Sequence, residues 1–324
     1  VTATLYTGAK IPMVGYGMWK VGKDIIPDMV SNLVEAGYRH IDNACDYGNE
    51  KEVGEGIKKV LDAGKVKRED LWVTSKLWNT FHRKEHVKAA CQKSLSDLGL
   101  EYLDLYLIHF PISLKFVPFE TRYPPEWFYD PTAENPKMEE DPVSIRETWE
   151  AMEELVDAGL VKNIGVANFN IGILRDLLSY CRIKPAVNQV ELHPYLTQEK
   201  LLRYCAAHDI HVTAFSSFGG SSYIELGGAV DGDLVFHEQL VKDIGKKYNK
   251  TPAQIALIWA VQRGTSVIPK TSNPQRLKEN IDVFNVTLTD EEMKSISALN
   301  KNRRFNDPGV FCEGAFKTFF PIYE

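Results

Sequence analysis

The segment IDNACDYGNE, residues 41–50, carries side chains that could move a proton. Asp42, Asp46 and Tyr47 lie close together in it, with Cys45 between the two carboxylates. The segment begins with the alternating pattern of a strand and ends in turn-forming residues. A phenol and two carboxylates at a strand end could form part of an acid–base site, if other strands bring matching groups to the same end.

Short β-branched or aromatic runs alternate along the chain with amphipathic segments of helical spacing. The eight runs span residues 14–19, 38–44, 70–78, 102–109, 161–169, 186–194, 210–218 and 265–270. Eight strands alternating with helices predict a (β/α)8 TIM barrel, an α/β fold, rather than an open sheet. The residues before the first run predict a hairpin around Thr7 and Gly8 that plugs the N-terminal end of the barrel.

Two stretches interrupt this rhythm. Residues 111–143 are rich in proline and aromatic residues, and residues 219–235 are rich in glycine. Both follow strands, which places them as long loops on the C-terminal face, where barrel enzymes keep their sites. No linker or repeat divides the chain, so we expect one domain over residues 1–324.

Composition excludes several classes of protein. A net charge of −6 does not favour nucleic acid or an anionic membrane as a partner, and no apolar run is long enough to span a bilayer. The five cysteines form no CxxC pair, which predicts reduced thiols in a cytoplasmic protein. Cys45 lacks an assigned base nearby, so we do not expect it to be a nucleophile.

The strand ends carry a set of polar and aromatic groups. They are Trp19, Asp42 with Tyr47 just beyond it, Lys76, His109, Asn168, Gln189, Phe215 and Lys270. Taken singly, each has an ordinary structural explanation, such as a turn carboxylate or a core histidine. Their occurrence on consecutive strands favours one shared site.

The chemistry of this set points to proton donation. A free tyrosine has a pKa near ~10, and a neighbouring ammonium such as Lys76 would lower that pKa. Asp42 could balance the charge of the lysine, and His109 could hold a carbonyl oxygen beside Tyr47. No nucleophile–base pair or HxH zinc spacing is present. A tyrosine acid beside a carbonyl suits reduction by an external hydride carrier.

These residues lie in motifs that resemble the aldo-keto reductases over nearly the whole chain. The motifs are DYGNE, SKLW, LIHFP, GVANF, NQVELHPYL and IPKTSNPQRLKEN. The resemblance implies a barrel that binds NADPH or NADH without a Rossmann fold, with Asp42, Tyr47, Lys76 and His109 as the catalytic tetrad. The stretches HFPISLKFVP, RYPP and RFNDP are similar to fungal D-xylose reductases.

The resemblance also implies contacts to cofactor and substrate. For the cofactor they are Asn168, Gln189, Phe215, Ser216, Glu225, Lys270, Thr271, Ser272, Arg276 and Asn280. For the substrate they are Trp19, Asp46, His109, Phe110 and Asn306. Three positions depart from the family pattern: Ala167 replaces a serine, Phe215 replaces a tyrosine, and IPKTS replaces IPKSN. Each lost neutral hydrogen bond would weaken cofactor binding by roughly 0.5–1.5 kcal/mol.

The expected activity is reduction of an aldose to a polyol, of the D-xylose to xylitol type, by a monomer or homodimer without a metal. Lys270 and Arg276 would bind the 2′-phosphate of NADPH, which we expect to be preferred, and Glu225 would make NADH usable. A sugar-phosphate reductase and a general aldehyde or ketone reductase are alternatives of the same fold. A non-catalytic NADPH-binding subunit is an alternative from another class.

Overall fold

The computed structural model describes every residue from Val1 to Glu324. The chain forms two compact units, each made of three segments. The first unit comprises Val1–Gly17, Asn32–Ile41 and Asn188–Phe305, and the second comprises Met18–Ser31, Asp42–Val187 and Asn306–Glu324. The expectation of a single domain therefore stays a prediction.

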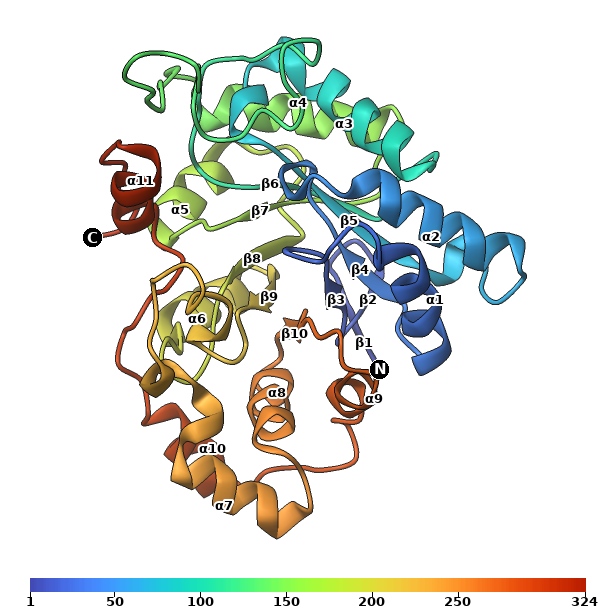
Figure 1. The fold of residues 1–324 in the computed structure, drawn as a ribbon, viewed down its shortest axis with the longest axis vertical. Helices are drawn as coiled ribbons and strands as arrows, with labels where there is room; N and C mark the ends of the chain where they lie inside the picture. Colours follow the sequence, from blue (N-terminus) through green and yellow to red (C-terminus); the bar gives the residue numbers. More distant parts are fainter. The chain divides into compact units, whose positions relative to one another are not determined.

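Eight strands form one sheet in the order in which they occur along the chain (Figure 1). They are β3 (Tyr16–Gly17), β4 (His40–Asp42), β5 (Trp72–Leu77), β6 (Leu105–Ile108), β7 (Ile164–Ala167), β8 (Val187–Glu191), β9 (His211–Phe215) and β10 (Ser266–Val267). Val14, just before β3, forms a parallel bridge with Val267 of β10, so the first strand meets the last. The eight parallel strands with helices between them confirm the predicted (β/α)8 barrel.

The strands are shorter than the sequence pattern predicts. The last run was expected over residues 265–270, but β10 ends at Val267. Pro269 has no backbone N–H to donate, so the ladder cannot continue through it. At the other edge, Gly17 ends β3, and a Cβ there would lie 2.9 Å from the carbonyl oxygen of Ile268.

The predicted N-terminal hairpin is present. β1 (Thr2–Thr4) pairs antiparallel with β2 (Lys10–Pro12). Gly8 has a φ of 86°, which a residue with a side chain rarely adopts, and its N–H donates to the carbonyl of Leu5. This confirms the hairpin, while its role as a plug stays a prediction.

Helices separate the strands. They are α1 (Ile26–Ala36), α2 (Glu50–Asp62), α3 (Lys84–Leu98), α4 (Ile145–Asp157), α5 (Ile171–Tyr180), α6 (Glu199–Ala207), α7 (Gln239–Tyr248), α8 (Pro252–Gln262), α9 (Pro274–Ile281), α10 (Asp290–Ser297) and α11 (Pro308–Phe316). Short 3₁₀ helices are η1 (Cys45–Tyr47), η2 (Arg68–Asp70), η3 (Asn79–Phe81), η4 (Gly220–Ser222), η5 (Asp231–Asp233) and η6 (Val235–His237).

Two of these helices, α10 and α11, lie beyond the elements that periodicity predicts. Both are short, and side-chain caps define their starts: Thr289 accepts from the N–H of Glu292, and Asp307 accepts from that of Gly309. Such caps carry more information about short helices than apolar spacing does, because one or two turns show little periodicity.

Large aromatic side chains fill the interior of both units. Trp149 in the second unit and Trp259 in the first are fully buried. The indole N–H of Trp149 donates to the carbonyl of Ile183 at 2.9 Å, and that of Trp259 donates to Oγ of Ser297 at 3.0 Å. Neither buried donor is therefore left without an acceptor.

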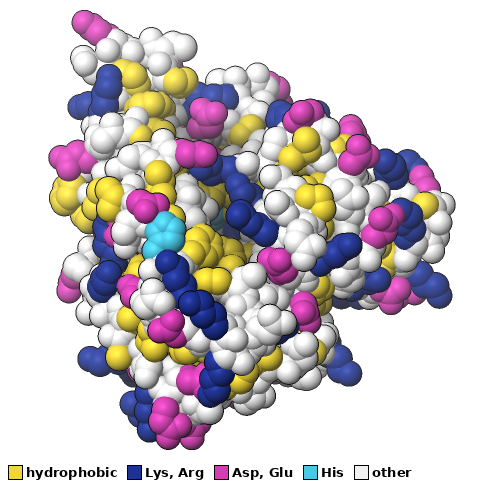
Figure 2. Space-filling model, turned by 60° about the horizontal axis from the view of Figure 1, so that its bottom comes forward, with side chains coloured by type: hydrophobic (Ala, Val, Ile, Leu, Met, Phe, Trp, Pro, Cys, Tyr) yellow, Lys and Arg dark blue, Asp and Glu magenta, His cyan; other side chains and the backbone are white.

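The surface carries both signs of charge, with lysine and arginine side chains interspersed among aspartate and glutamate (Figure 2). None of the helices combines the length and the apolar composition that crossing a membrane requires. All five cysteines are free thiols, as predicted.

Candidate active site

The four residues of the predicted tetrad all lie in the second unit. Asp42 ends β4, Lys76 lies in β5, and His109 follows β6 directly. Tyr47 ends η1, the 3₁₀ turn that continues from β4. Because β4, β5 and β6 are successive strands of the parallel sheet, their carboxyl ends meet at one edge.

The ammonium of Lys76 is the centre of this group. Its Nζ donates to Oδ1 of Asp42 at 2.6 Å, to the carbonyl of Asn43 at 3.0 Å and to Oη of Tyr47 at 2.9 Å. The side chains of Lys76 and Asp42 are each 1% exposed. A buried ammonium with all three protons committed has a fixed orientation, and one of the three points at the phenol.

Burial decides the pKa of Tyr47. It raises that pKa to about 12, while the Lys76 ammonium acts in the opposite direction. The predicted lowering by Lys76 is present, but desolvation outweighs it, so the net pKa is raised and not lowered. Burial also lowers the pKa of Lys76, but Asp42 and Tyr47 together more than reverse this, and the net direction is upward. Near neutral pH the pair is a protonated phenol and an ammonium.

His109 is neutral near pH 7, since burial and the Lys76 charge hold its pKa well below the ordinary value. Its ring lies edge-on to that of Tyr47, with 6.0 Å between centroids, and its Nδ1 is buried without a hydrogen-bond partner. Its backbone carbonyl accepts from Nδ2 of Asn168 at 2.9 Å. A neutral imidazole can donate one hydrogen bond to a carbonyl oxygen.

An aromatic cluster packs beside His109, and sequence reasoning identified only Phe110 from it. Trp78, directly after β5, lies 5.3 Å from the His109 ring and 4.9 Å from Trp127, centroid to centroid. Trp127, from the long loop 111–143, stacks on Phe316 of α11 at 5.4 Å. The cluster excludes water from one side of His109. The aromatic residues of that loop and the SKLW motif were the available signals.

The remaining predicted substrate residues lie in the same unit. Trp19 and Asn306 are half-buried. Asp46, also half-buried, lies within η1 directly before Tyr47, and burial together with the nearby Glu126 raises its pKa to about 7. Glu126 belongs to the long loop, and its carbonyl accepts from the indole N–H of Trp78.

The predicted cofactor residues, apart from Asn168, all lie in the first unit. Gln189 is buried in β8, and Phe215 ends β9 half-buried. Ser216 follows with a φ of 55°, and its hydroxyl lies 2.9 Å from that of Tyr223. Glu225 is exposed in the glycine-rich loop.

The predicted phosphate site lies around the start of α9. Lys270, Ser272 and Arg276 are exposed, Thr271 is half-buried, and Asn280 is buried. The N–H groups of Gln275 and Arg276 are already capped by Oδ1 of Asn273. These two N–H groups are therefore not available to an anion, and the predicted phosphate contact is left to side chains. The guanidinium of Arg276 makes no ion pair with Glu279, whose carboxylate instead accepts from Gln275.

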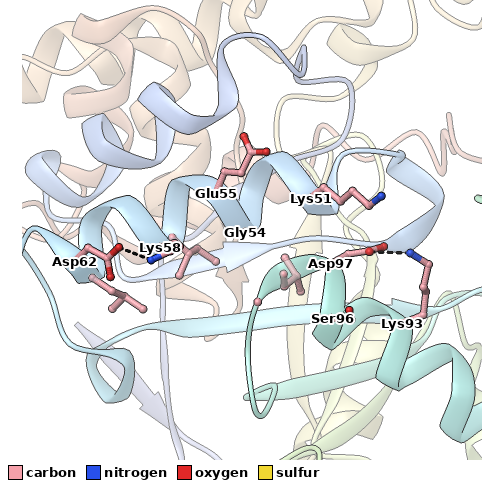
Figure 3. Close-up of a pocket in the computed structure, with 12 residues that line it drawn as sticks. Lys51, Gly54, Glu55, Lys58, Asp62, Lys93, Ser96 and Asp97 are labelled. Atoms are coloured by element: carbon pink, nitrogen blue, oxygen red, sulfur yellow. Dashed lines mark hydrogen bonds and ion pairs between the residues drawn. The ribbon is translucent and has the colours of Figure 1, made fainter.

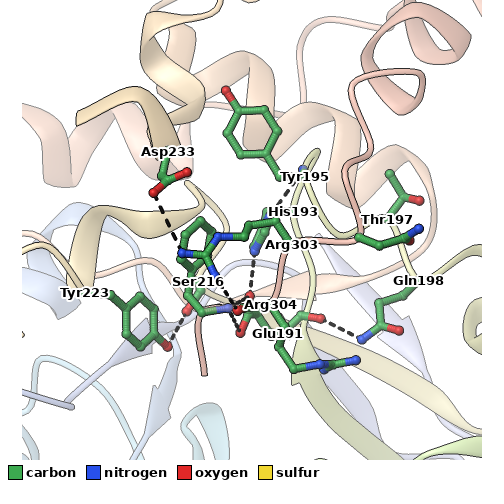
Figure 4. A network of polar contacts seen from close by, with 12 residues as sticks. Glu191, His193, Tyr195, Thr197, Gln198, Ser216, Tyr223, Asp233, Arg303 and Arg304 are labelled. Atoms are coloured by element: carbon green, nitrogen blue, oxygen red, sulfur yellow. Dashed lines mark hydrogen bonds and ion pairs between the residues drawn. The ribbon is translucent and has the colours of Figure 1, made fainter. Parts of the chain in front are cut away.

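A polar network that the sequence did not reveal ties the glycine-rich loop to the segment before Asn306, within the first unit (Figure 4). Both carboxylate oxygens of Glu191 accept from the N–H of Phe305, at 3.1 and 2.9 Å, and Nε2 of His193 lies 2.8 Å from one of them. The Arg303 side chain donates to the carbonyl of Gly228 at 3.1 Å. The loop is therefore held by specific contacts.

A hollow lined by residues of α2 and α3 lies away from the tetrad (Figure 3). It measures ≈ 800 Å³. Two ion pairs line it, Lys93 with Asp97 at 2.7 Å and Lys58 with Asp62. The two helices approach closely: a Cβ at Gly54 would lie 2.6 Å from the carbonyl oxygen of Asp97.

Comparison with known proteins gives consistent results. Residues 13–301 match the model of the Aldo/keto reductase family. The chain is 50% identical to the NADPH-dependent aldose reductase GRE3 of Saccharomyces cerevisiae over 98% of both chains. It is 50% identical to the NAD(P)H-dependent D-xylose reductase xyl1 of Aspergillus niger, over 95% of this chain and 96% of the relative.

A solved structure agrees in fold. The aldose reductase of Schistosoma japonicum superposes with a TM-score of 0.86 at 37% identity, over 100% of this chain and 99% of the other. The family match covers most of the chain, and two relatives share half of its residues. The chain belongs to the aldo/keto reductase family.

Proposed function

We propose that this protein reduces the carbonyl of an open-chain aldose to the corresponding polyol, using NADPH or NADH. The observation that carries the proposal is the Lys76 ammonium, 2.9 Å from the Tyr47 hydroxyl and 2.6 Å from the Asp42 carboxylate. The names of the relatives, D-xylose reductase and aldose reductase, supply the class of reaction.

Tyr47 is the general acid in this proposal. When bound, the nicotinamide cofactor supplies a hydride to the carbonyl carbon. As negative charge develops on the carbonyl oxygen, the O–H bond of Tyr47 breaks and a new O–H bond forms on the substrate. A phenol whose pKa is about 12 stays protonated until a stronger base, the developing alkoxide, takes the proton.

Lys76 stabilises the product of that transfer. The Tyr47 phenolate forms beside an ammonium that is already oriented, so little reorganisation is needed in the transition state. Asp42 keeps the ammonium charged in its buried position. His109, neutral and walled by Trp78 and Phe110, donates to the carbonyl oxygen and holds it for the proton.

The donor set fits a nicotinamide dinucleotide. Phe215 offers an aromatic face for the nicotinamide ring, and Gln189 with Asn168 offers side-chain amides for its carboxamide. Lys270 and Arg276 are exposed cations that suit the 2′-phosphate of NADPH, and Glu225 is a carboxylate that suits ribose hydroxyls. We therefore propose NADPH as the preferred cofactor, with NADH usable.

We assign substrate selection to two polar and two aromatic side chains. Asp46 and Asn306 would pair with sugar hydroxyls, while Trp19 and Phe110 form apolar walls. The departures at Ala167 and Phe215 remove hydroxyls on the cofactor side. They tune cofactor binding and leave the proton donor untouched.

The test is a panel of carbonyl compounds assayed with each cofactor. It includes D-xylose, a phosphorylated pentose, a hydroxyl-free aldehyde and a simple ketone. The proposal predicts turnover of D-xylose, with one polyol formed for each cofactor oxidised. Binding of NADPH without turnover of any carbonyl would identify a binding subunit instead, and a marked preference for the phosphorylated sugar would identify a sugar-phosphate reductase.

A further inference from the structure

Glu50 is a buried carboxylate that the proposed mechanism does not use. It opens α2, is 4% exposed and lies in the second unit, as the tetrad does. One of its oxygens accepts from Oγ of Ser75 at 2.7 Å, and the other accepts from Oγ of Ser94 at 2.7 Å. Burial raises its pKa, while both hydroxyls and the Lys76 charge act against that rise. Burying a carboxylate costs free energy unless it is hydrogen-bonded, which suggests that the buried position of Glu50 has a specific role.

The two ends of this tie lie close in sequence to the reacting pair. Glu50 is three residues after Tyr47, and Ser75 is the residue before Lys76 in β5. Successive side chains of a strand point to opposite faces, so Ser75 faces the helices while Lys76 faces the tetrad. The Glu50–Ser75 hydrogen bond therefore joins the segment that carries Tyr47 to the strand that carries Lys76. It lies on the face of the strand opposite to the Lys76 side chain.

The surroundings make this tie stiff. Asn49, between Tyr47 and Glu50, is 2% exposed and donates to the carbonyl of Met18 at 3.0 Å. Ser94 anchors the other oxygen of Glu50 to α3. A chain held at Asn49 and at both carboxylate oxygens of Glu50 has little freedom to shift the phenol.

We propose that Glu50 is a positioning residue, which holds the Tyr47 hydroxyl at its hydrogen-bonding distance from Lys76 through its hydrogen bonds to Ser75 and Ser94. This inference rests on the proposed function of Tyr47. Displacing a reacting group by about 1 Å can cost ~10²-fold in rate, so even a partial loss of this tie is measurable.

The hydrogen bonds matter here more than the charge. A glutamine in place of Glu50 keeps the shape, and it keeps both bonds because a serine hydroxyl can either donate or accept. An alanine removes both bonds. Glu50→Gln should therefore retain kcat within about threefold, whereas Glu50→Ala should lower it about tenfold or more. The KM for D-xylose and the Kd for NADPH should change little in either variant.

Glu153 provides a matched control. It is likewise 4% exposed, lies in α4, and accepts from the backbone N–H groups of Arg182 and Ile183 at 2.6 Å each. It ties no part of the tetrad. Glu153→Ala should lower the free energy of unfolding without lowering the kcat of the folded protein.

If Glu50→Ala does not fold, the two serines test the same idea. Ser75→Ala frees the strand of Lys76 and should lower kcat. Ser94→Ala frees only α3, leaves the Glu50–Ser75 bond in place, and should lower kcat less. Equal loss of kcat in the two serine variants, or equal loss in Glu50→Gln and Glu50→Ala, would overturn the inference.

The variant Tyr47→Phe separates this inference from the proposed function. In its background, Glu50→Ala should cause no further loss in kcat, because the group that it positions is gone. If Tyr47→Phe itself keeps normal kcat, the proposed function fails. If Tyr47→Phe is impaired while Glu50→Ala keeps the wild-type kcat, only the positioning role fails.

Discussion

Replacing Lys76 by methionine should separate the catalytic role of the lysine from its structural one. The substitution leaves the Asp42 carboxylate 1% exposed without its ammonium, and it removes the donor to the carbonyl of Asn43. Breaking a buried ion pair from one side typically costs ~3–5 kcal/mol. We therefore expect the free energy of unfolding to fall by that amount.

The double variant Lys76→Met/Asp42→Leu supplies the comparison. Replacing both partners of a buried pair with apolar residues is often neutral in stability, so most of the loss should be regained. Activity should not return, because no cation remains 2.9 Å from the Tyr47 hydroxyl to stabilise the phenolate. Loss of one such electrostatic partner typically lowers the rate ~10²–10³-fold.

Two assays decide the matter. Urea unfolding gives the free energy of each variant, and single-turnover reduction of D-xylose with saturating NADPH gives the rate of the chemical step. We expect the double variant to be nearly as stable as the wild type and as slow as the single variant. If the double variant recovers rate together with stability, Lys76 is a structural residue and the reasoning is refuted.

Three further predictions concern cofactor and substrate. Arg276→Ala should weaken NADPH binding by roughly 1.5–3 kcal/mol, the scale of a charge-assisted hydrogen bond, and leave NADH binding nearly unchanged in a titration; equal weakening of both would refute the 2′-phosphate contact. Asn306→Ala should raise the KM for aldoses but not for a hydroxyl-free aldehyde, and equal changes would make the residue structural. Folding raises the pKa of Asp46 from 3.8 to about 7. The protonated carboxyl therefore contributes its full stabilisation to the folded state below pH ~4, and this contribution is lost as the pH rises through about 7. In unfolding experiments above pH ~7, Asp46→Asn should therefore be more stable than the wild type. The ionised form accepts hydrogen bonds better, so the wild-type KM for aldoses should fall over the same rise in pH, and a flat profile would contradict the substrate contact.

Periodicity was sufficient to predict the architecture. The eight strand runs and the hairpin appear where alternation and turn residues place them, because these signals are local. The first and last residues of the elements could be predicted less well. β10 stops before Pro269, and α10 and α11 begin at caps that apolar spacing does not register.

The proximity of Asp42, Tyr47, Lys76 and His109 could be predicted because parallel strands bring their ends to one edge of the sheet. Their electrostatics could not, since the balance between burial and the Lys76 charge at Tyr47 depends on how much of the phenol water can reach. Contacts made by long loops were missed for a similar reason. Nothing local in the sequence connects Trp127 with Phe316, or Glu191 with Phe305.

The side-chain cap of α9 was not predicted from the sequence. Asn273 precedes Pro274, and its side chain accepts from the N–H groups of Gln275 and Arg276 in the first turn of α9. The sequence contains both the cap and the cations. Only the structure shows that the cap bonds these N–H groups and that Lys270 and Arg276 are exposed.

The most direct test of the account is the rate of the chemical step in Tyr47→Phe. The substitution removes one hydroxyl, keeps the ring that packs against His109, and leaves the Lys76–Asp42 pair intact. Single-turnover reduction of D-xylose with saturating NADPH should slow at least ~10²-fold, the scale of general acid catalysis, while the Kd for NADPH stays within about twofold of the wild-type value. A chemical step at close to the wild-type rate would show that Tyr47 does not donate the proton.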